Sequence, residues 1–301
     1  MRGNELKYER NCFGRHQGVI GMNQSHTIAL TGANGFIGKQ LQQTFDRVVV
    51  LRRDDSVDTL LRKLEGVDTV INLAGAPIVR RWSESYKRVL YESRVLSTRK
   101  LVEAINRSDV GYFVSTSAVG IYPNDKACDE RYTEYAEDFL AKLCMAWEAE
   151  ARKCAKPTAV VRLGVVLGKE GGALQKMLLP FKLGLGGVIG DGKMMTSWIH
   201  IADLIAIYRF LMARKAEGVY NAVSPHPVSN RRFTKALGSA LHRPTFVPLP
   251  TIVLKMLYGE AATVLIDSKE VYPRRLEALG FAYGYETIET ALEEICEGER
   301  I

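Results

Sequence analysis

The sequence predicts an α/β fold: a Rossmann-type, doubly wound parallel sheet with a smaller, mostly helical C-terminal substrate lobe. Short apolar strands alternate with helix-like stretches from Thr27 onward, which is typical of a parallel sheet covered by helices on both faces. A glycine-rich turn joins the first strand to the first helix. After about Gly168 the chain becomes richer in glycine and mixes short helices with proline-containing segments, and this change predicts the lobe.

The predicted elements follow one another in a regular order. Five apolar segments are expected to be strands: 27–30, 47–51, 68–75, 112–118 and 158–163. Three longer segments between them have helical character: 36–45, 83–105 and 137–155. We therefore expect a non-structural extension over residues 1–25, a Rossmann domain over 26–168 and the substrate lobe over 169–301. This prediction leaves open that one strand and one helix from residues 169–301 pack with the sheet of the Rossmann domain.

Composition and charge narrow the class of protein. The chain has 301 residues, of which 47% are hydrophobic and 25% are charged, as in ordinary globular proteins. No apolar run approaches the roughly 18–20 residues that a membrane span needs. The net charge of +7 is dispersed and forms no basic stripe with aromatic residues. The five cysteines form no C-x-x-C pair, which favours reduced thiols over disulfides or a zinc site. We expect a cytoplasmic monomer or homodimer with no metal and neither a nucleic-acid nor a membrane partner.

The glycine turn TGANGFIG predicts a dinucleotide site. Its three glycines allow a tight exit from the strand, a close approach to a pyrophosphate, and close packing of the following helix on the sheet. The first residues of that helix present free N–H groups and the positive end of the helix dipole. The cofactor-binding residues predicted here are Gly32, Gly35, Phe36, Ile37 and Gly38. The alternative is a tight strand–helix turn without a ligand.

The end of the second strand indicates which dinucleotide is bound. An acidic residue at this point accepts a hydrogen bond from the ribose of NAD, whereas an arginine accommodates the 2′-phosphate of NADP. The chain reads VVVLRRDD, so Arg52 and Arg53 come first and Asp54 and Asp55 follow. Because guanidinium groups make charge-assisted bonds to phosphate, we expect NADP (NADPH) as the cofactor. The alternative is an exposed Arg–Asp loop.

The motifs TGANGFIG, INLAG and VSTSAVGIY, in this order, resemble those of the extended short-chain dehydrogenase/reductase superfamily. Later segments, among them GGALQKMLLPFKLGLGG and SWIHIADL, make the chain similar to an atypical branch described as NAD(P)-binding and nucleoside-diphosphate-sugar epimerase-like. Some members of that branch carry a cell-division-inhibitor label. The resemblance covers roughly residues 27–295.

The resemblance implies further cofactor contacts. Leu73, Ala74 and Gly75 end a central strand at the place where such enzymes contact the dinucleotide. Arg94 falls where extended members carry an asparagine near the cofactor, and a cation at that edge of the sheet can reach a pyrophosphate or ribose. The alternative for Arg94 is an arginine on the helix surface. Val166 lies where the family lines the nicotinamide side.

The resemblance also implies a catalytic serine, tyrosine and lysine, of which only the first has a match. Ser117 is the expected substrate-polarising residue, with Thr116 as the alternative. The tyrosine and lysine should stand four residues apart on the helix that contains AKLCMAWE, but these positions hold Leu140 and Cys144. A tyrosine needs a neighbouring cation to work near neutral pH, since its pKa is ordinarily about 10. Any acid–base chemistry must therefore use other groups.

Two residues are candidates for the missing acid–base role. Tyr122, in GIYPND, is the expected replacement phenol, and Tyr135 is a poorer one. His200, in SWIHIAD, is a second proton carrier, with Asp203 able to orient its ring. The alternative for His200 is a helix cap. Two functions stay open: an NADP-dependent oxidoreductase or epimerase (an isomerase) for a nucleotide sugar or other small polar metabolite, or an NADP-binding regulatory or scaffold protein with weak catalysis.

A chain that starts at Met22 is expected to melt within about 2 °C of the full-length protein. Residues 1–21 show neither strand alternation nor helical periodicity, so they have no apolar face with which to dock on a core. Differential scanning calorimetry of the two chains measures the difference. A loss of several degrees on truncation would contradict the prediction and show that the segment packs.

Overall fold

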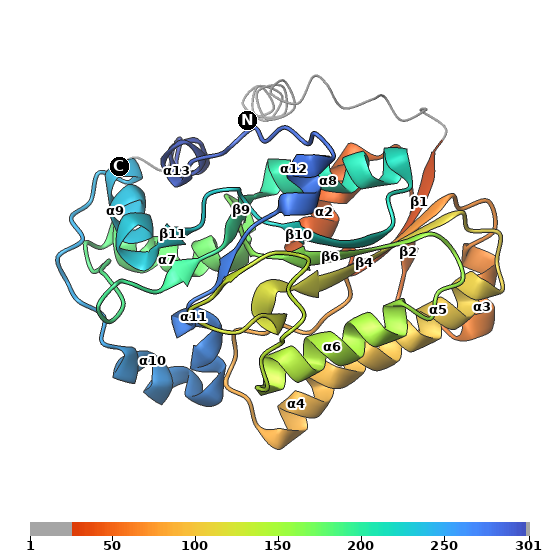
Figure 1. Cartoon of the computed structure of the whole chain (residues 1–301), viewed down its shortest axis with the longest axis horizontal. Helices are drawn as coiled ribbons and strands as arrows, with labels where there is room; N and C mark the ends of the chain where they lie inside the picture. The colour runs from red at the N-terminus through yellow and green to blue at the C-terminus, as the bar shows by residue number, and fades with distance from the viewer. Residues whose placement is uncertain (1–25, 299–301) are drawn as a thin grey trace.

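The structure, a computed structural model, describes residues 26–298, so the predicted extension over residues 1–25 lies outside the described part apart from its boundary. A parallel sheet with helices on both faces forms one half of the molecule, and the C-terminal lobe lies beside it (Figure 1). The predicted fold class is confirmed. No helix between residues 26 and 298 combines the length and the hydropathy needed to cross a membrane.

The sheet has six parallel strands in the order β10-β6-β4-β3-β1-β2. They are β1 (Thr27–Thr31), β2 (Arg47–Leu51), β3 (Thr69–Asn72), β4 (Tyr112–Ala118), β6 (Thr158–Leu163) and β10 (Gly218–Ala222). The strand order reverses at β1: β2 lies on one side of β1, and β3, β4, β6 and β10 follow in succession on its other side. The reversal therefore falls between β1 and β3. Ligands of open α/β sheets bind outside the carboxyl ends of the strands at such a reversal.

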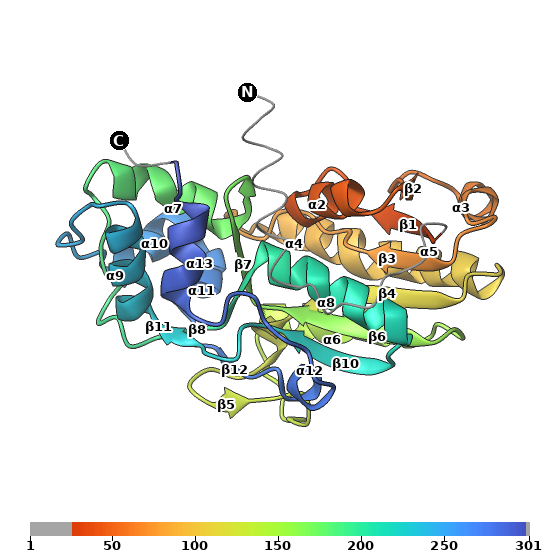
Figure 2. The same cartoon turned by 90° about the horizontal axis from the view of Figure 1, so that it is seen from above.

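Helices bury both faces of the sheet (Figure 2). Side chains of one face pack with α2 (Phe36–Thr44) and α8 (Ile201–Arg214), and those of the other face pack with α3 (Val57–Lys63), α5 (Ser97–Asn106) and α6 (Phe139–Ala151). Successive residues of a strand point to opposite faces. Along β4, Tyr112 and Val114 therefore join the first core, and Phe113 joins the second.

A π-helical turn interrupts the long helix that the sequence predicts over 83–105. The turn, η1 (Glu92–Leu96), separates α4 (Glu84–Tyr91) from α5 without breaking the run. Such turns accommodate an extra residue within a helix and occur often at functional sites. Arg94 lies at the centre of η1.

The lobe is built from short elements, most of which surround a separate apolar core. They are β7 (Val165–Gly168), α7 (Gly172–Lys182), β8 (Met195–Thr196), β9 (Trp198–His200), β11 (Val228–Ser229), α9 (Asn230–Ala240), α10 (Thr251–Tyr258), η3 (Gly259–Ala262), α11 (Thr263–Ile266) and α13 (Ile288–Ile295). Side chains of α10, η3 and α11 instead join an apolar cluster with α4 and α6. The chain also returns to the sheet. α8 and β10 are part of the sheet layers, while β12 (Glu270–Val271) pairs with β5 (Ala127–Cys128) and α12 (Arg274–Ala278) packs beside β10. Where one domain ends and the next begins stays a prediction.

Candidate functional site

The glycine turn packs against the end of β3, at the reversal of strand order. Gly32 has a φ of +67°, and a Cβ on it would lie 2.8 Å from the carbonyl oxygen of Leu73. A Cβ on Gly38 would lie 2.4 Å from the carbonyl oxygen of Gly32. Only glycine fits these two positions. Gly35 is the N-cap of α2 and has no side chain with which to cap it, so the first N–H groups of the helix suit an external anion.

The first residues of α2 also join the turn to the lobe. The ring of Phe36 covers Gly168 and Gly171, where a Cβ would lie 2.5 Å and 2.7 Å from ring atoms. Ile37 packs against the core between the sheet and α8. Val166 lies on β7 beside this contact and pairs with Ile199 of β9. The predicted cofactor residues Phe36, Ile37 and Val166 therefore come together at one edge of the sheet.

A chain of hydrogen bonds fixes the end of β3. The hydroxyl of Thr31 donates to the side chain of Asn72 over 2.7 Å and accepts the N–H groups of Leu73 (3.0 Å) and Ala74 (3.1 Å). Asn72 in turn donates to the hydroxyl of Thr98 on α5 over 2.8 Å. The segment predicted to contact the cofactor is thus held by β1 on one side and by α5 on the other.

Arg94 reaches the same edge from the π-turn. Its guanidinium donates to the carbonyl of Ala76 over 2.9 Å and lies 5.5 Å from the centre of the Trp147 ring. A Cβ on Gly75 would come within 3.0 Å of the guanidinium, so the glycine makes room for the arginine. Burial lowers the pKa of Arg94. Arg94 is thus half-buried at the sheet edge and not exposed on a helix surface, and its role in cofactor binding stays a prediction.

The loop after β2 exposes two arginines, while the carboxylate of its Asp55 is engaged in hydrogen bonds within the protein. The carboxylate of Asp55 accepts the N–H of Arg52 (2.7 Å) and the ammonium of Lys63 (2.6 Å). Burial acts to raise the pKa of Asp55, but the hydrogen bond from Lys63 and the backbone outweighs it and the pKa is lowered. Lys100 donates to the carbonyl groups of Arg53 and Asp55, at 2.7 Å each. The side chains of Arg52 and Arg53 are exposed.

A groove of about 350 Å³ lies between this loop and the π-turn. Its lining consists of two cations, one carboxylate, two hydroxyls and two apolar side chains: Arg53, Lys100, Glu92, Ser93, Ser97, Val89 and Leu96. The two hydroxyls donate to the backbone carbonyls of Leu90 and Glu92. The groups of this groove that suit a phosphate are therefore the guanidinium of Arg53 and the ammonium of Lys100.

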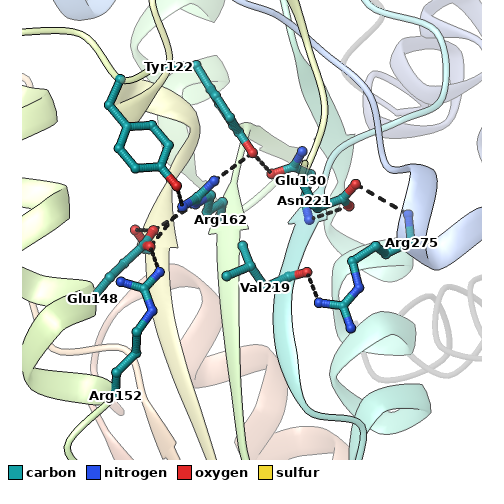
Figure 3. Close-up of polar contacts among 10 residues, drawn as sticks. Tyr122, Glu130, Glu148, Arg152, Arg162, Val219, Asn221 and Arg275 are labelled. Carbon is teal, nitrogen blue, oxygen red and sulfur yellow. Dashed lines mark hydrogen bonds and ion pairs between the residues drawn. The ribbon is translucent and has the colours of Figure 1, made fainter. Parts of the chain in front are cut away.

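Two of the predicted catalytic residues, Ser117 and Tyr122, lie in a buried polar network, and Figure 3 shows the part of it around Tyr122. The hydroxyl of Ser117 donates to Glu148 over 2.7 Å. The hydroxyl of Tyr122 accepts a 2.7 Å bond from Arg162 and donates to Asn221 over 2.9 Å. Ser117 is 1% exposed and Tyr122 is 0% exposed. Burial raises the pKa of Tyr122 to about 12, so the phenol keeps its proton. This geometry favours a structural role for both hydroxyls, and their catalytic role stays a prediction.

The centre of the network is an ion pair between β6 and α6. Arg162 donates to the two oxygens of Glu148 over 2.7 Å and 2.9 Å and to the hydroxyl of Tyr135 over 3.0 Å. Arg152 adds a 2.6 Å bond to Glu148 from the next helical turn. Burial would raise the pKa of Glu148, but Arg162 outweighs it and holds that pKa below its usual range.

The network continues to the C-terminal segment through β10. One oxygen of Glu130 accepts the N–H of Asn221 over 2.9 Å, and the other accepts the N–H of Arg275 over 3.3 Å. The guanidinium of Arg275 donates to the carbonyl of Val219 over 2.9 Å. Burial raises the pKa of Glu130. The buried groups thus connect β4, β6 and α6 to β10 and α12 (Figure 3).

His200 lies in a different cluster, at the start of α8. Its Nδ1 accepts the N–H of Ala202 over 3.2 Å and caps the helix, so Nε2 carries the proton and faces Glu294 at 3.0 Å. The ring stacks on Tyr285 with the ring centres 3.8 Å apart. Asp203 accepts the N–H groups of Gly284 (2.8 Å) and Tyr285 (3.0 Å). These contacts support the helix-cap alternative, and the structure does not bring His200 together with Ser117 and Tyr122 in one hydrogen-bonded network.

The two positions expected to hold the tyrosine and lysine lie on α6. Leu140 is partly exposed, and its Cβ lies 3.8 Å from the point where a Cβ on Gly120 would stand, just after β4. Cys144 is buried, and burial together with the charge of Glu148 raises the pKa of its thiol to about 12. Neither side chain can exchange a proton near neutral pH.

Comparison with known proteins decides the family. The sequence profile of the NAD dependent epimerase/dehydratase family matches residues 28–223, and a domain of unknown function (DUF1731) matches residues 249–295. The chain belongs to the NAD dependent epimerase/dehydratase family. The predicted membership is confirmed.

Several members of this epimerase/dehydratase family are similar over most of their length. The chloroplastic epimerase family protein SDR39U1 homolog of Arabidopsis thaliana is 36% identical over 89% of this chain and 86% of its own. Mouse epimerase family protein SDR39U1 is 40% identical over 76% of this chain and 82% of its own. The crystal structure of human SDR39U1 with NADPH superposes with a TM-score of 0.84 at 35% identity, covering 90% of this chain and 99% of that one.

Some site features were not predicted from the sequence. The Thr31–Asn72–Thr98 chain, Lys100 and the Arg162–Glu148 pair were missed. The sequence does carry one signal for the pair, because Arg162 is a charged residue within the otherwise apolar strand TAVVRL. Within residues 26–298, no group of three or more His, Cys, Asp or Glu side chains is placed to hold a metal ion.

Tyr122→Phe is expected to lower the free energy of unfolding by about 1–3 kcal/mol, because it removes the acceptor of a buried N–H of Arg162 and the donor to the side-chain oxygen of Asn221. Urea denaturation measures the change. Tyr132→Phe is the matched control: its hydroxyl makes an exposed 3.3 Å contact with Glu134, and the change should stay within about 0.5 kcal/mol. Equal stabilities for the two variants would contradict the structural role of Tyr122.

Proposed function

We propose that this epimerase/dehydratase family member binds NADPH at the β1/β3 reversal and uses it in an oxidoreductase or epimerase reaction on a small molecule. The observation that carries the proposal is the uncapped start of α2, which faces the reversal across a turn that only glycine fits. A helix start of this kind binds phosphate groups. Human SDR39U1 was crystallised with NADPH, which supports the same cofactor for this chain.

Each predicted cofactor residue has a role in this proposal. The N–H groups of Phe36, Ile37 and Gly38 receive the pyrophosphate, and the fixed segment Leu73–Gly75 lies beside it. Arg94 adds a cation that contacts the pyrophosphate or a ribose. The groove with Arg53 and Lys100 suits the 2′-phosphate that distinguishes NADPH from NADH, and Arg52 stands beside it. Val166 lines the nicotinamide side.

NADPH, when bound, supplies a hydride. The chain's own residues hold the dinucleotide at the sheet edge and exclude water through the packed Phe36 and the lobe. No tyrosine–lysine pair is present for proton transfer, because Leu140 and Cys144 occupy the positions at which the resemblance predicts the tyrosine and the lysine. The proton then exchanges with solvent or with a group of the substrate itself.

The alternative is a regulatory or scaffold protein that binds NADPH with little turnover. The observation in its favour is that Ser117, Tyr122 and His200 are all buried and engaged in contacts that hold secondary structure. Protein saturated with NADPH, followed at 340 nm with a pool of metabolites, separates the two functions. Oxidation linked to a new product mass supports the enzyme, and its absence across the pool supports the regulatory protein.

Location and assembly stay predictions from the sequence. A cytoplasmic monomer or homodimer is proposed, with a small-molecule substrate as its partner. The name of the Arabidopsis relative places that protein in the chloroplast.

The protein is expected to bind NADPH at least tenfold more tightly than NADH, because Arg53 and Lys100 line the groove after β2 and the exposed Arg52 directly precedes Arg53. Titration calorimetry with the two dinucleotides measures the ratio. Arg52→Ala combined with Arg53→Ala should reduce the ratio to about threefold or less. Arg62→Ala, on the exposed side of α3, is the control and should leave it unchanged. Equal affinities of the parent protein for NADPH and NADH would contradict the predicted preference for NADPH.

A further inference from the structure

A single buried hydroxyl joins the parts of the sheet edge at which the cofactor is proposed to lie. The side-chain oxygen of Thr98 on α5 accepts the indole N–H of Trp147 over 2.9 Å and the side-chain amide of Asn72 over 2.8 Å. Thr98 and Asn72 are each 1% exposed, and Trp147 is 5% exposed. Because the three side chains are buried, the Thr98 oxygen takes the place of water as the acceptor of both N–H groups.

The first branch from Thr98 runs to the backbone after β3, and its donors and acceptors set its direction. An indole N–H can only donate, so the Thr98 oxygen is an acceptor. With its NH₂ group turned to Thr98, Asn72 presents its oxygen to the hydroxyl of Thr31, which donates to it over 2.7 Å. The lone pairs of Thr31 then accept the N–H groups of Leu73 and Ala74. One orientation of the Asn72 amide thus determines how this backbone is held.

The glycine turn packs against the same backbone. The carbonyl oxygen of Leu73 lies 2.8 Å from the point where a Cβ on Gly32 would stand, so the two segments are in close contact. The turn continues into α2 through a 2.9 Å bond from the N–H of Gly35 to the carbonyl of Gly32. A shift of Leu73 would therefore change its position relative to the N–H groups at the start of α2.

The second branch from Thr98 reaches the same segment through Arg94. The ring of Trp147, whose N–H bonds to Thr98, has its centre 5.5 Å from the guanidinium carbon of Arg94. Arg94 donates to the carbonyl of Ala76 over 2.9 Å. The backbone that follows β3 is therefore held at its start by the first branch and at its end by the second, and the two branches meet at one hydroxyl.

We propose that Thr98 is a positioning residue for the dinucleotide: without touching the cofactor, its hydroxyl holds the segment Leu73–Gly75 and Arg94 in the places from which they meet the pyrophosphate and ribose. The inference rests on the proposed binding of NADPH at the β1/β3 reversal and deepens it. Both branches end at the pyrophosphate side of that site. The groove with Lys100, proposed for the 2′-phosphate, lies outside them, so Thr98 should act equally on NADPH and NADH.

Thr98→Val removes the acceptor and keeps nearly the same side-chain shape. Titration calorimetry should show NADPH binding weakened about tenfold, since two buried N–H groups lose their acceptor. NADH should lose affinity by the same factor. Thr98→Ser keeps the oxygen and should bind NADPH within about twofold of the parent protein. Melting temperatures verify that each variant is folded at the temperature of the titration.

Thr69→Val is the matched control at the other end of the same strand. Thr69 is 1% exposed at the start of β3, and its hydroxyl lies 3.0 Å from Nε2 of His26. The change removes a buried threonine hydroxyl, as Thr98→Val does, but far from the carboxyl ends of the strands. It should lower the melting temperature and leave NADPH affinity unchanged.

Thr31→Val gives a second test on a variant outside α5. It interrupts the first branch nearer the cofactor, so it should weaken NADPH binding by a factor similar to that of Thr98→Val. Because the two hydroxyls act in one chain, the double variant should bind no more weakly than the weaker single variant.

The outcomes separate the inference from the proposed function. Failure of the parent protein to bind NADPH contradicts the proposed function. Where the parent binds NADPH, the positioning role is overturned if Thr98→Val binds as tightly as the parent, if Thr98→Ser is as weak as Thr98→Val, or if Thr69→Val loses as much affinity. A loss confined to NADPH also overturns it, because the effect would then lie in the groove with Lys100. If Thr98→Val does not fold, parent-like affinity in Thr31→Val overturns the inference.

Discussion

A buried ion pair between Arg162 and Glu148 is the interaction around which the sheet and its neighbours are arranged. Taking both charges out of water costs several kcal/mol per ion, and only close geometry with further hydrogen bonds offsets this cost. The chain supplies them from Ser117 on β4, from Tyr122 directly after η2 (Val119–Ile121), from Tyr135 between β5 and α6, and from Arg152 directly after α6. These partners come from separate segments of the chain. These segments therefore have to stay in place relative to one another, because otherwise the buried charges of Arg162 and Glu148 would lose hydrogen-bond partners.

The Arg162–Glu148 pair also helps to position the edge of the sheet where the cofactor is proposed to lie. The pair fixes α6 against β6, and α6 in turn contacts α5 and the π-turn. Trp147 of α6 donates to Thr98, the residue that also receives Asn72, so the position of α6 is linked to the end of β3. A cofactor edge built this way is held by side-chain hydrogen bonds as well as by the sheet. The hydroxyl of Ser117, which was predicted to polarise a substrate, donates to Glu148 within this network.

Local patterns were enough to predict the fold and the glycine turn. Strand alternation, glycine spacing and the arginines after β2 are read within a few residues of chain, and the structure places each of them as expected. The direction of Ser117 could not be predicted in this way, because β4 is buried on both faces and its sequence shows no polar side. Its orientation toward α6 depends on Glu148, which is 31 residues away. Tyr258 of α10 joins an apolar cluster with side chains of α4 and α6, a contact of still longer range that no local sequence pattern predicts.

The π-turn makes the site sensitive to the length of one helix. An α-helix turns by about 100° per residue. The extra residue within η1 therefore determines which way the side chains of α4 point relative to those of α5. Deleting a single residue from Glu92–Leu96 would restore a regular helix and swing either Arg94 or the whole of α4 by more than a quarter of a turn. Arg94 would leave Gly75, or Lys87 would leave Glu260. A relative that lacks one residue at this point is therefore expected to arrange this edge of the sheet differently, even where every other residue is the same.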